Sequence, residues 1–433
     1  MTPEIASAIL PGMSRRKTIV FLGDGMADEP IPELGHRTPL QAAATPAMDE
    51  IARRGSSGTL LTLPEGYPTS SDVANMSVLG CDLATEMCGR GPLEALGRGI
   101  PLGPDDLCFR MNLVRVDASG VLRDYSGGQI DNGEARRLIE RLNATLGSDK
   151  IRFFPGVRYR NLLVLSGPEF HPAVHCEKPD DHHGDRMDEL LPKALAPEAE
   201  PTAALLRELI HKARAILPDG RANAIWPWSG GRIGTLRKLT DRFGITGAVI
   251  SAVDVIAGLG RALGLEVISV PGATGYIDTH YEGKADAALE AIQHRDFVYV
   301  HVEGIDEVSH EQRLDLKLKA IEDFDRRLIA RVMARAGSGL VYAVLPDHPV
   351  PIRHGKHTRT PVPVAVCGPG IPADAVQTFD ELACRQGGLG AMKGDDFVRL
   401  LFGPPPPLAF GRFPWTARSG CTYNREKFHK EMP

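Results

Sequence analysis

A short apolar run that ends in paired polar residues is the feature that most constrains the fold of this chain. Residues 339–345 read Gly-Leu-Val-Tyr-Ala-Val-Leu, and Pro346, Asp347 and His348 follow at once. A continuous apolar run of this kind is typical of a strand that is buried on both faces of a sheet. Because open α/β sheets carry their chemistry at the carboxyl ends of the strands, we expect this Asp-His pair to bind a metal ion or a substrate.

Two other apolar runs are followed by the same kinds of side chain. Residues 17–22 lead to Asp24, which lies between two glycines, and residues 296–302 lead to Asp306 and His310. Because Asp306 and His310 are four residues apart on a predicted helical turn, they face the same way and can hold one ion. Taken singly, Asp24 could be an ordinary turn residue and Asp306 a helix cap, so only the whole set predicts a site.

Ser71 is the candidate nucleophile. It stands at the start of a helix predicted over residues 72–79, which Gly80 ends. The free N–H groups and the positive dipole end of a helix N-terminus favour an alkoxide or a phosphate, although a plain N-cap is the alternative. Because no Gly-x-Ser-x-Gly element surrounds Ser71, we expect metal ions rather than a catalytic triad to activate its hydroxyl.

A third imidazole completes the strongest local signal. His357 follows His348 by nine residues, in a loop stiffened by prolines. Neighbouring residues on an extended backbone point apart, so Asp347 and His348 can serve two different ions or turn toward one. Mixed oxygen and nitrogen ligands suit Mn²⁺ first, with Mg²⁺, Zn²⁺ or Co²⁺ as other choices. Two such ions would lower the pKa of the Ser71 hydroxyl and neutralise a phosphoryl group in transfer.

The order of strands and helices predicts an α/β fold with a largely parallel sheet flanked by helices. Residues 247–250 and 265–270 read as strands on either side of a helix over residues 253–263, which is a β-α-β unit. A long helix is predicted over residues 314–335, and another strand over residues 363–367.

The middle of the chain departs from this alternation. Short mixed strands are predicted there over residues 109–116 and 161–166. We therefore predict a core made of residues 15–105 and 245–433, and an inserted α+β cap domain over residues 106–244. The four prolines after Gly403 predict an extended tail on the surface.

Composition limits the possible partners and compartment. The formal net charge is −5, so no basic field attracts nucleic acid, and no apolar stretch approaches the length of a membrane span. The seven cysteines contain no Cys-x-x-Cys pair, and residues 1–13 lack the pattern of a signal peptide. We expect a cytoplasmic protein with free thiols that binds neither nucleic acid nor membranes. The sequence leaves the oligomeric state open.

Three cationic residues are candidate contacts for an anionic substrate. Arg110 and Arg160 fall in the predicted cap, and Arg160 lies where a turn leads into a strand. Guanidinium groups bind phosphate and carboxylate with two parallel hydrogen bonds. Lys319 follows the Asp306 segment and can reach the phosphate, although a solvated helix face explains it equally well.

The ordered set of Asp24, Ser71, Asp306, His310, Asp347, His348 and His357 resembles the metal site of the alkaline phosphatase superfamily. Within that superfamily, residues 17 to about 402 are similar to the cofactor-independent phosphoglycerate mutases of the shorter, archaeal type. The motifs that carry this resemblance are Gly23-Asp24-Gly25-Met26, residues 38–48, Ser71-Asp72-Val73-Ala74-Asn75, and residues 89–95, 109–112, 306–310 and 356–363.

The resemblance implies a division of the ligands and a reaction. One ion would be held by Asp306, His310 and His357, and the other by Asp24, Ser71, Asp347 and His348. Ser71 would take the phosphoryl group of 3-phosphoglycerate, a small phosphorylated hydroxy acid of glycolysis, and return it to the 2-hydroxyl under a closed cap that keeps water out.

A second resemblance leaves an alternative function open. Residues 124–128, 272–275 and 345–349 look like a bacterial subgroup proposed to act as homoserine kinases. That alternative covers a phosphotransferase or phosphatase acting on another small alcohol, but the chain has no recognisable ATP-binding loop.

Overall fold

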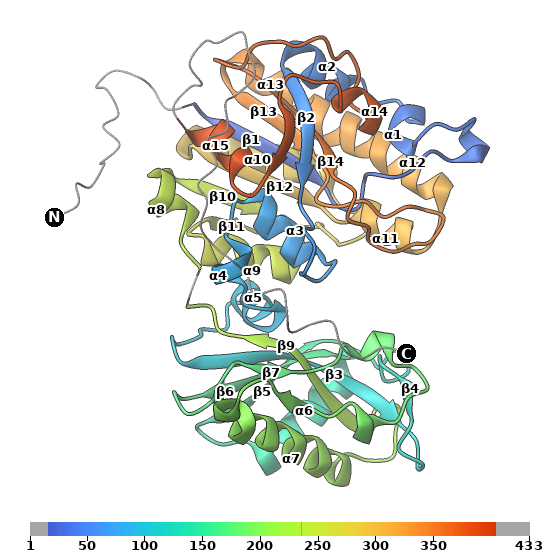
Figure 1. The fold of residues 1–433 in the computed structure, drawn as a ribbon, viewed down its shortest axis with the longest axis vertical. Coiled ribbons are helices and arrows are strands. Elements are labelled where there is room, and N and C mark those ends of the chain that lie inside the picture. The colour runs from blue at the N-terminus through green and yellow to red at the C-terminus, as the bar shows by residue number, and fades with distance from the viewer. Residues whose placement is uncertain (1–15, 235, 404–433) are drawn as a thin grey trace, which may run out of the picture. The chain divides into compact units, whose positions relative to one another are not determined.

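Two main sheets organise the protein. The structure is a computed structural model, and it describes residues 16–234 and 236–403 (Figure 1). These residues form an eight-stranded sheet, a five-stranded sheet, and a short pair made of β7 (Val174–His175) and β8 (Lys193–Ala194). The proline-rich tail predicted after Gly403 lies outside the described residues.

The eight-stranded sheet is largely parallel, as predicted. β1 pairs in parallel with β12 and β13, β10 pairs in parallel with β11 and β12, and β14 runs antiparallel to its two neighbours. Across the sheet the strands are β11 (Glu266–Ile268), β10 (Gly247–Ile250), β12 (Phe297–Val302), β1 (Thr18–Gly23), β13 (Val341–Leu345), β14 (Val362–Cys367), β2 (Ser56–Leu61) and β15 (Gly390–Lys393).

Helices cover both faces of this sheet, and each face has its own apolar core. One core includes side chains of α1 (Pro39–Ala42), α2 (Pro46–Arg54), α10 (Tyr281–His294), α11 (Gly304–His310), α12 (Leu314–Asp323), α13 (Ala330–Ala336) and α14 (Glu381–Cys384). The other includes side chains of α3 (Ser71–Val78), α4 (Leu83–Glu86), α8 (Leu239–Phe243), α9 (Asp254–Ala262) and α15 (Asp396–Phe402). The strands of the centre are fully buried, which explains their continuous apolar sequences.

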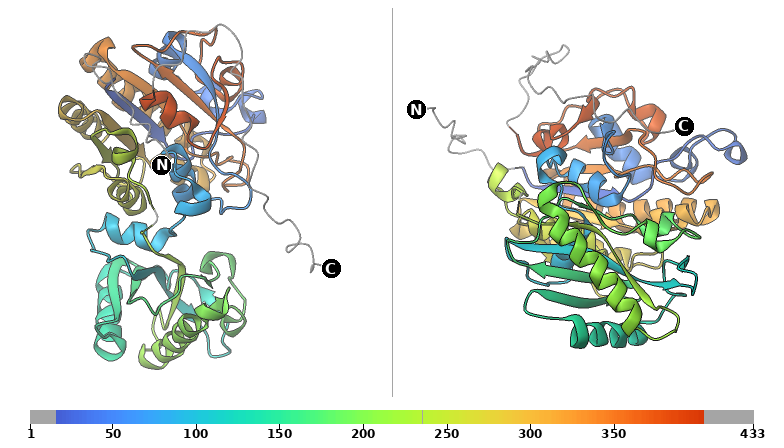
Figure 2. Two further views of the ribbon diagram at one scale, coloured as in Figure 1. Left: turned by 60° about the vertical axis from the view of Figure 1, so that its left-hand side comes forward. Right: turned by 60° about the horizontal axis from the view of Figure 1, so that its bottom comes forward.

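The middle of the chain builds the second sheet. Its strands are β3 (Asp106–Val116), β4 (Leu122–Asp124), β5 (Ile151–Val157), β6 (Arg160–Ser166) and β9 (Ala224–Gly231). α6 (Asn132–Leu146) and α7 (Glu200–Ile216) pack on one face, as Figures 1 and 2 show. On the other face, Ala95 of α5 (Arg90–Gly97) packs against Cys108 and Leu162. This sheet supports an inserted cap, whose limits at residues 106 and 244 stay a prediction.

The long helix predicted over residues 314–335 is not a regular α-helix. Between α12 and α13, residues Phe324–Ile329 form a π-helical segment. Apolar periodicity cannot distinguish such a segment from an α-helix, because it changes the pitch over little more than one turn. Within the segment, Asp325 is fully buried.

Asp325 caps a helix that has no cap of its own. Thr45, the residue before α2, makes no capping hydrogen bond with its side chain. Instead, the backbone N–H groups of Ala47 and Met48 donate to the Asp325 carboxylate at 3.2 and 2.7 Å. These N–H groups belong to the first turn of α2, where no intrahelical acceptor exists.

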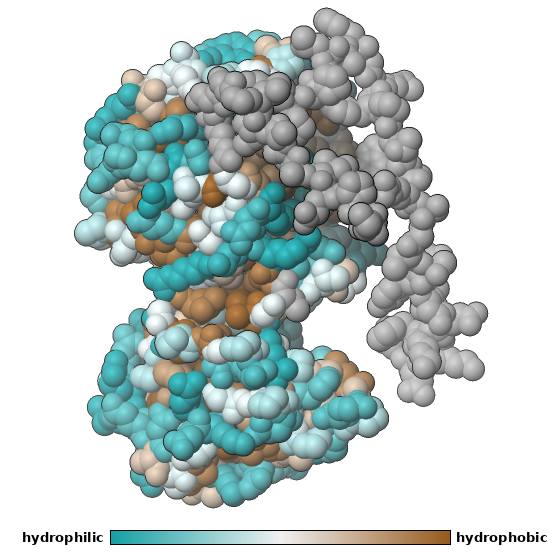
Figure 3. Space-filling model, turned by 90° about the vertical axis from the view of Figure 1, so that its left-hand side faces the viewer, coloured by the Kyte–Doolittle hydropathy of each residue, from teal (hydrophilic) through white to brown (hydrophobic). Residues whose placement is uncertain are grey.

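The exterior carries few large apolar side chains. Val157, Leu195 and Leu382 are the large hydrophobic residues exposed among those that the structure describes. Hydrophilic side chains cover much of the face shown in Figure 3. Within residues 16–403, apart from residue 235, no helix combines the length and apolar character needed to cross a membrane.

We expect Asp325→Ala to lower the free energy of unfolding by about 1–2 kcal/mol, because it leaves two buried N–H groups of α2 without an acceptor. Urea denaturation followed by circular dichroism measures this loss. Asp315→Ala is the control, because Asp315 is 66% exposed and pairs with Arg313 at the surface. Equal effects of the two substitutions would contradict the capping role.

Candidate active site

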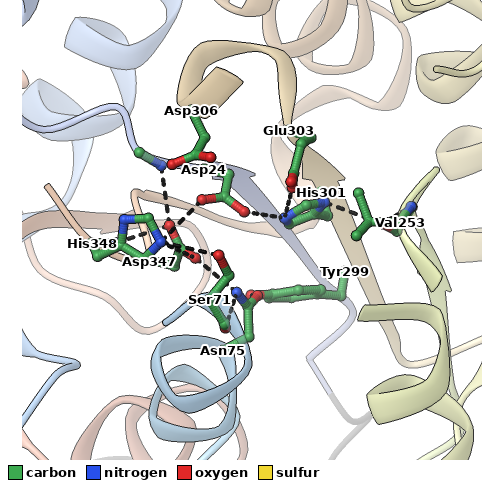
Figure 4. Close-up of polar contacts among 12 residues, drawn as sticks. Asp24, Ser71, Asn75, Val253, Tyr299, His301, Glu303, Asp306, Asp347 and His348 are labelled. Atoms are coloured by element: carbon green, nitrogen blue, oxygen red, sulfur yellow. Dashed lines mark hydrogen bonds and ion pairs between the residues drawn. The ribbon is translucent and has the colours of Figure 1, made fainter. Parts of the chain in front are cut away.

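Three neighbouring parallel strands bring the predicted strand-end residues together. Gly23 of β1 is in register with Val302 of β12, and Leu22 with Leu345 of β13. The loops that follow these strands therefore leave the same edge of the sheet, as Figure 4 shows for the side chains that they carry. Asp24 follows β1, Asp306 lies on α11 just after β12, and Asp347 follows β13.

Four of the predicted ligands surround one point. The Oγ atom of Ser71, the first residue of α3, lies 3.2 Å from Nε2 of His348. The same nitrogen lies 3.3 Å from Oδ1 of Asp24 and 3.4 Å from Oδ2 of Asp347. The structure thus brings together the four residues that the family resemblance assigns to one ion.

The other three predicted ligands lie beside them. Nε2 of His310 is 3.3 Å from Asp306 and 2.9 Å from Nε2 of His357, and His357 is 3.5 Å from Asp306. The rings of His348 and His357 stack with their centroids 3.8 Å apart, so the two groups adjoin. We call these seven residues the ligand cluster: Asp24, Ser71, Asp306, His310, Asp347, His348 and His357.

The donor atoms of the ligand cluster fit divalent cations. Oδ1 of Asp24 and Oδ1 of Asp306 are buried and have no hydrogen-bond partner. Ligand atoms of Asp24, Asp347 and His348 lie within 4.8 Å of one another, and so do those of Asp306, His348 and His357. Carboxylate oxygens and imidazole nitrogens in this mixture are ligands for Mn²⁺, Zn²⁺ and related ions.

The raised pKa values of the buried carboxylates also indicate a cation site. Burial raises the pKa of Asp24 well above its ordinary value, and the charges of Asp347 and Glu303 raise it further. Burial raises the pKa of Asp347 to about 7, and burial with the charge of Asp306 raises the pKa of Glu303 to about 8. A bound cation would remove this penalty on ionisation.

Two of the three histidines of the ligand cluster are neutral and can act as metal ligands directly. Burial lowers the pKa of His348 far below its ordinary value and that of His357 to about 4, so both rings are neutral at pH 7. Burial also opposes the charge of His310, but its hydrogen bond to Asp306 outweighs this and raises the pKa of His310 to about 9. A metal ion at His310 must therefore displace a proton.

Two arginines, Arg90 and Arg110, have buried Nε–H groups that make no hydrogen bond, although Nε of Arg90 lies 3.5 Å from Oε1 of Glu94. Nη1 of Arg110 donates to Glu94 at 2.8 Å. Burial lowers the pKa of His357, and the charges of Lys178 and Arg90 lower it further, so Arg90 lies close enough to act on the ligand cluster. Unused guanidinium donors at this place can bind the phosphate or the carboxylate of a substrate.

Of the other two predicted substrate contacts, Arg160 lies near the site and Lys319 does not. Arg160 is exposed; partial desolvation lowers its pKa, but Tyr159, Glu94 and Glu307 raise it more, so Arg160 is within electrostatic reach of α11. Lys319 is not brought to the site by any contact that the structure shows. Its side chain is 58% exposed and pairs with Asp323 four residues later on the surface of α12.

A family model and a sequence relative that match the chain carry the same description. Residues 52–223 match the family model for 2,3-bisphosphoglycerate-independent phosphoglycerate mutase. The mutase of that name from Methanosarcina acetivorans is 45% identical over 395 residues, which cover 89% of this chain and 99% of the relative. The chain belongs to the 2,3-bisphosphoglycerate-independent phosphoglycerate mutase family. The family expected from the sequence motifs is confirmed.

Further proteins are similar to the chain in sequence or in fold. A probable mutase of this kind from Geobacter sulfurreducens is 46% identical over 403 residues, with 89% of this chain and 99% of the relative covered. The cofactor-independent phosphoglycerate mutase from Thermoplasma acidophilum has a TM-score of 0.63 at 27% identity, over 90% of this chain and 100% of that chain. The PH0037 protein from Pyrococcus horikoshii has a TM-score of 0.77 at 27% identity, with 90% and 97% covered.

The sequence did not predict which residues orient the ligands through hydrogen bonds. Nδ2 of Asn75 donates to Oδ2 of Asp347 and to the carbonyl of Ser71, both at 2.8 Å. The hydroxyl of Tyr299 donates to Oδ1 of Asn75 at 2.7 Å and so fixes the orientation of the amide. Asn75 lies one helical turn after Ser71, which is the signal that could have found it.

A cavity of about 720 Å³ lies away from the ligand cluster, at the C-terminal end of α3. Ser77, Gly80 and Cys81 line it, together with Arg242 and Arg399 of α8 and α15. No member of the ligand cluster borders this cavity, so we do not assign the reaction to it.

We expect Asp24→Asn to stabilise the metal-free protein at pH 8 by about 1–3 kcal/mol, and to have a much smaller effect at pH 4. The raised pKa of Asp24 means that the folded state loses stability relative to the unfolded chain as the pH rises above about 4. The amide of the variant does not ionise, so the variant avoids this loss of stability. The loss is complete only when the Asp24 carboxylate of the folded wild type is ionised.

The same variant should gain less thermal stability from added Mn²⁺ than the wild type, since a ligand is lost. Differential scanning fluorimetry with EDTA and with Mn²⁺ at both pH values measures the two opposite effects. Asp219→Asn is the control, because Asp219 is 83% exposed. Destabilisation of the metal-free variant at pH 8 would contradict the prediction that the ionised, buried Asp24 carboxylate destabilises the fold.

Proposed function

We propose that the chain interconverts 3-phosphoglycerate and 2-phosphoglycerate through a phosphoserine at Ser71. The observation that carries the proposal is the position of Ser71. Its hydroxyl lies 3.2 Å from His348 inside the ligand cluster, at the N-terminus of α3. Relatives that match nearly the whole of their own length to this chain carry the mutase name, which supports the same reaction.

The ligand cluster would hold two divalent ions, with Mn²⁺ as the first choice. Asp306, His310 and His357 would hold one ion. Asp24, Ser71, Asp347 and His348 would hold the other. When bound, the ions supply positive charge that favours the Ser71 alkoxide and balances the charge of the phosphoryl group.

The reaction then needs two transfers. In the first, a bond forms between Ser71 Oγ and phosphorus while the bond from phosphorus to the 3-oxygen of the substrate breaks. Ser71 loses its proton, and the 3-oxygen of glycerate gains one. In the second, the 2-hydroxyl of the retained glycerate loses its proton and attacks phosphorus, and Ser71 is released as the hydroxyl. The N–H groups of the first turn of α3 favour the phosphoryl charge during both transfers.

The cationic residues would retain the glycerate between the two transfers. Arg90 and Arg110 present buried Nε–H groups that make no hydrogen bond, and Arg160 adds a third guanidinium near α11. Holding the intermediate keeps its hydroxyls close to phosphorus, which raises their effective concentration over that of water. The segment of residues 106–244 would serve as the cap that excludes water from the phosphoserine.

Ser71→Ala should lower mutase turnover by at least about a thousandfold and leave bound metal largely unchanged, because the other six ligands remain. Turnover is measured with 3-phosphoglycerate and Mn²⁺ in the absence of 2,3-bisphosphoglycerate. Mass spectrometry of the wild-type peptide that contains Ser71 should show phosphate after incubation with 3-phosphoglycerate. Ser77→Ala is the control, because Ser77 is a buried serine on the same helix.

The assay also separates the alternative function. Incubation of the wild type with ATP and homoserine should give no phosphohomoserine. Transfer to homoserine without mutase turnover would favour the other small-alcohol phosphotransferase. Phosphate on a residue other than Ser71 would remove Ser71 as the nucleophile.

Arg160→Ala should raise KM for 3-phosphoglycerate about tenfold or more, since a charge-assisted hydrogen bond to the substrate contributes about 1.5–3 kcal/mol. Steady-state kinetics and metal analysis measure the effect. Arg123→Ala is the control, because Arg123 is 55% exposed and pairs with Asp117. An unchanged KM would exclude Arg160 from the substrate site.

A further inference from the structure

A chain of hydrogen bonds leads from Asp24 to the loop after β10. The backbone N–H of Val253 donates to Oγ of Ser251 at 3.1 Å, and this hydroxyl lies 3.1 Å from Nδ1 of His301. Nε2 of His301 lies 2.9 Å from Oδ2 of Asp24. Figure 4 shows the imidazole between Val253 and Asp24. His301 and Asp24 are both fully buried, so water does not compete for these bonds.

The partners of the imidazole determine where its proton lies. Ser251 Oγ already accepts the N–H of Val253, which leaves its own hydrogen free to donate to Nδ1 of His301. Nε2 then carries the proton and faces Asp24 Oδ2 at 2.9 Å and Glu303 Oε2 at 3.6 Å. The opposite tautomer would turn a nitrogen lone pair toward two carboxylates, which is unfavourable in a buried site.

This arrangement divides the two oxygens of Asp24 between two tasks. Oδ2 accepts from His301, while Oδ1 has no hydrogen-bond partner and lies 3.3 Å from Nε2 of His348. The carboxylate therefore presents a single free oxygen toward the ligand cluster. A carboxylate that could rotate would offer either oxygen and would lose entropy on binding an ion.

We propose that His301 is a positioning residue for Asp24 and that Ser251 sets the proton of His301, so that Asp24 presents one fixed oxygen to a divalent ion. This inference rests on the proposed two-ion function of the ligand cluster. It adds to that function a supporting pair from β12 and from the loop after β10, which the sequence motifs did not contain.

The backbone around His301 is held firmly enough for this role. His301 is in register with Leu22 of β1, two residues before Asp24. The ammonium group of the fully buried Lys284 donates to the carbonyl of His301 at 2.8 Å. The imidazole therefore extends from a fixed strand toward a fixed loop, and only its proton needs to be set by Ser251.

The same atoms allow one competing arrangement. Ligand atoms of Asp24, His301 and Glu303 lie within 4.8 Å of one another, so they could themselves hold an ion. Such an ion needs the lone pair of His301 Nε2, and the proton would then lie on Nδ1. The position of the proton thus separates a positioning role from a third cation site.

The first test compares Ser251→Ala with Ser309→Ala by titration with Mn²⁺ alone, followed by electron paramagnetic resonance. Ser309 is a buried serine near the cluster whose hydroxyl donates only to the carbonyl of Ile305, so it is the matched control. We expect Ser251→Ala to weaken the binding of one of two Mn²⁺ ions about tenfold or more, and Ser309→Ala to change neither.

Mn²⁺ binding by the wild type distinguishes a failure of the proposed function from a failure of the positioning role. If the wild type binds no Mn²⁺, the proposed function fails, and His301 and Ser251 have no bound ion toward which to orient Asp24. If it binds two ions and Ser251→Ala binds both equally well, the proposed function stands and the positioning role is overturned.

A second pair of variants keeps the test decisive if Ser251→Ala does not fold. His301→Gln retains an N–H donor that reaches Asp24, whereas His301→Leu retains none. We expect His301→Gln to hold both ions within about threefold of the wild-type affinity and His301→Leu to lose about tenfold or more for one. Equal affinities in the two variants would overturn the proposal.

The tautomer gives a readout that a merely structural role would not move. In protein labelled with ¹⁵N at histidine and loaded with diamagnetic Mg²⁺, we expect the proton of His301 on Nε2, as in the metal-free protein. A proton on Nδ1 together with a third bound ion per chain would assign His301 to a cation site instead and would overturn its positioning role.

Discussion

The burial of several carboxylates at one place is the constraint on which the rest of the site depends. Asp24, Asp306 and Asp347 follow three adjacent strands, and the sheet register places them at one edge. Because these three groups are buried, they cannot all ionise without nearby positive charge. The neutral imidazoles of His348 and His357 add ligand atoms without adding charge, so the whole cluster is arranged for cations and for an anion that binds to them.

Buried polar contacts hold the loops that carry these ligands. The ammonium group of Lys317 lies 2.8 Å from Oδ2 of Asp28 and donates to the carbonyl of Val350 at 2.9 Å. It thus connects the loop after β1 with the loop after β13. Arg359 donates to the carbonyls of Pro64 and Tyr67, and so joins the His357 loop to the segment that leads to Ser71. Such contacts make the positions of the ligands depend on the packed core rather than on flexible loops.

Local sequence patterns predicted much of the core and little of its support. The strand predicted over residues 247–250 has those limits in the structure, because a buried strand needs a continuous apolar run. The helix over residues 314–335 was wrong in its middle, where the π-helical segment lets Asp325 cap α2. Lys319 shows a related limit, because a helical period does not reveal which face of a helix meets the site.

The sequence by itself determined which residues are chemically equipped to form the ligand cluster, because each follows a strand or opens a helix that its own neighbours specify. Only the tertiary structure decided how they meet. Ser71 and His348 are 277 residues apart in the chain, and so are Asp24 and His301. Contacts of that range depend on strand order and packing, which leave no periodic trace in the sequence. For the same reason the contact of His301 with Asp24 became visible only in the folded chain.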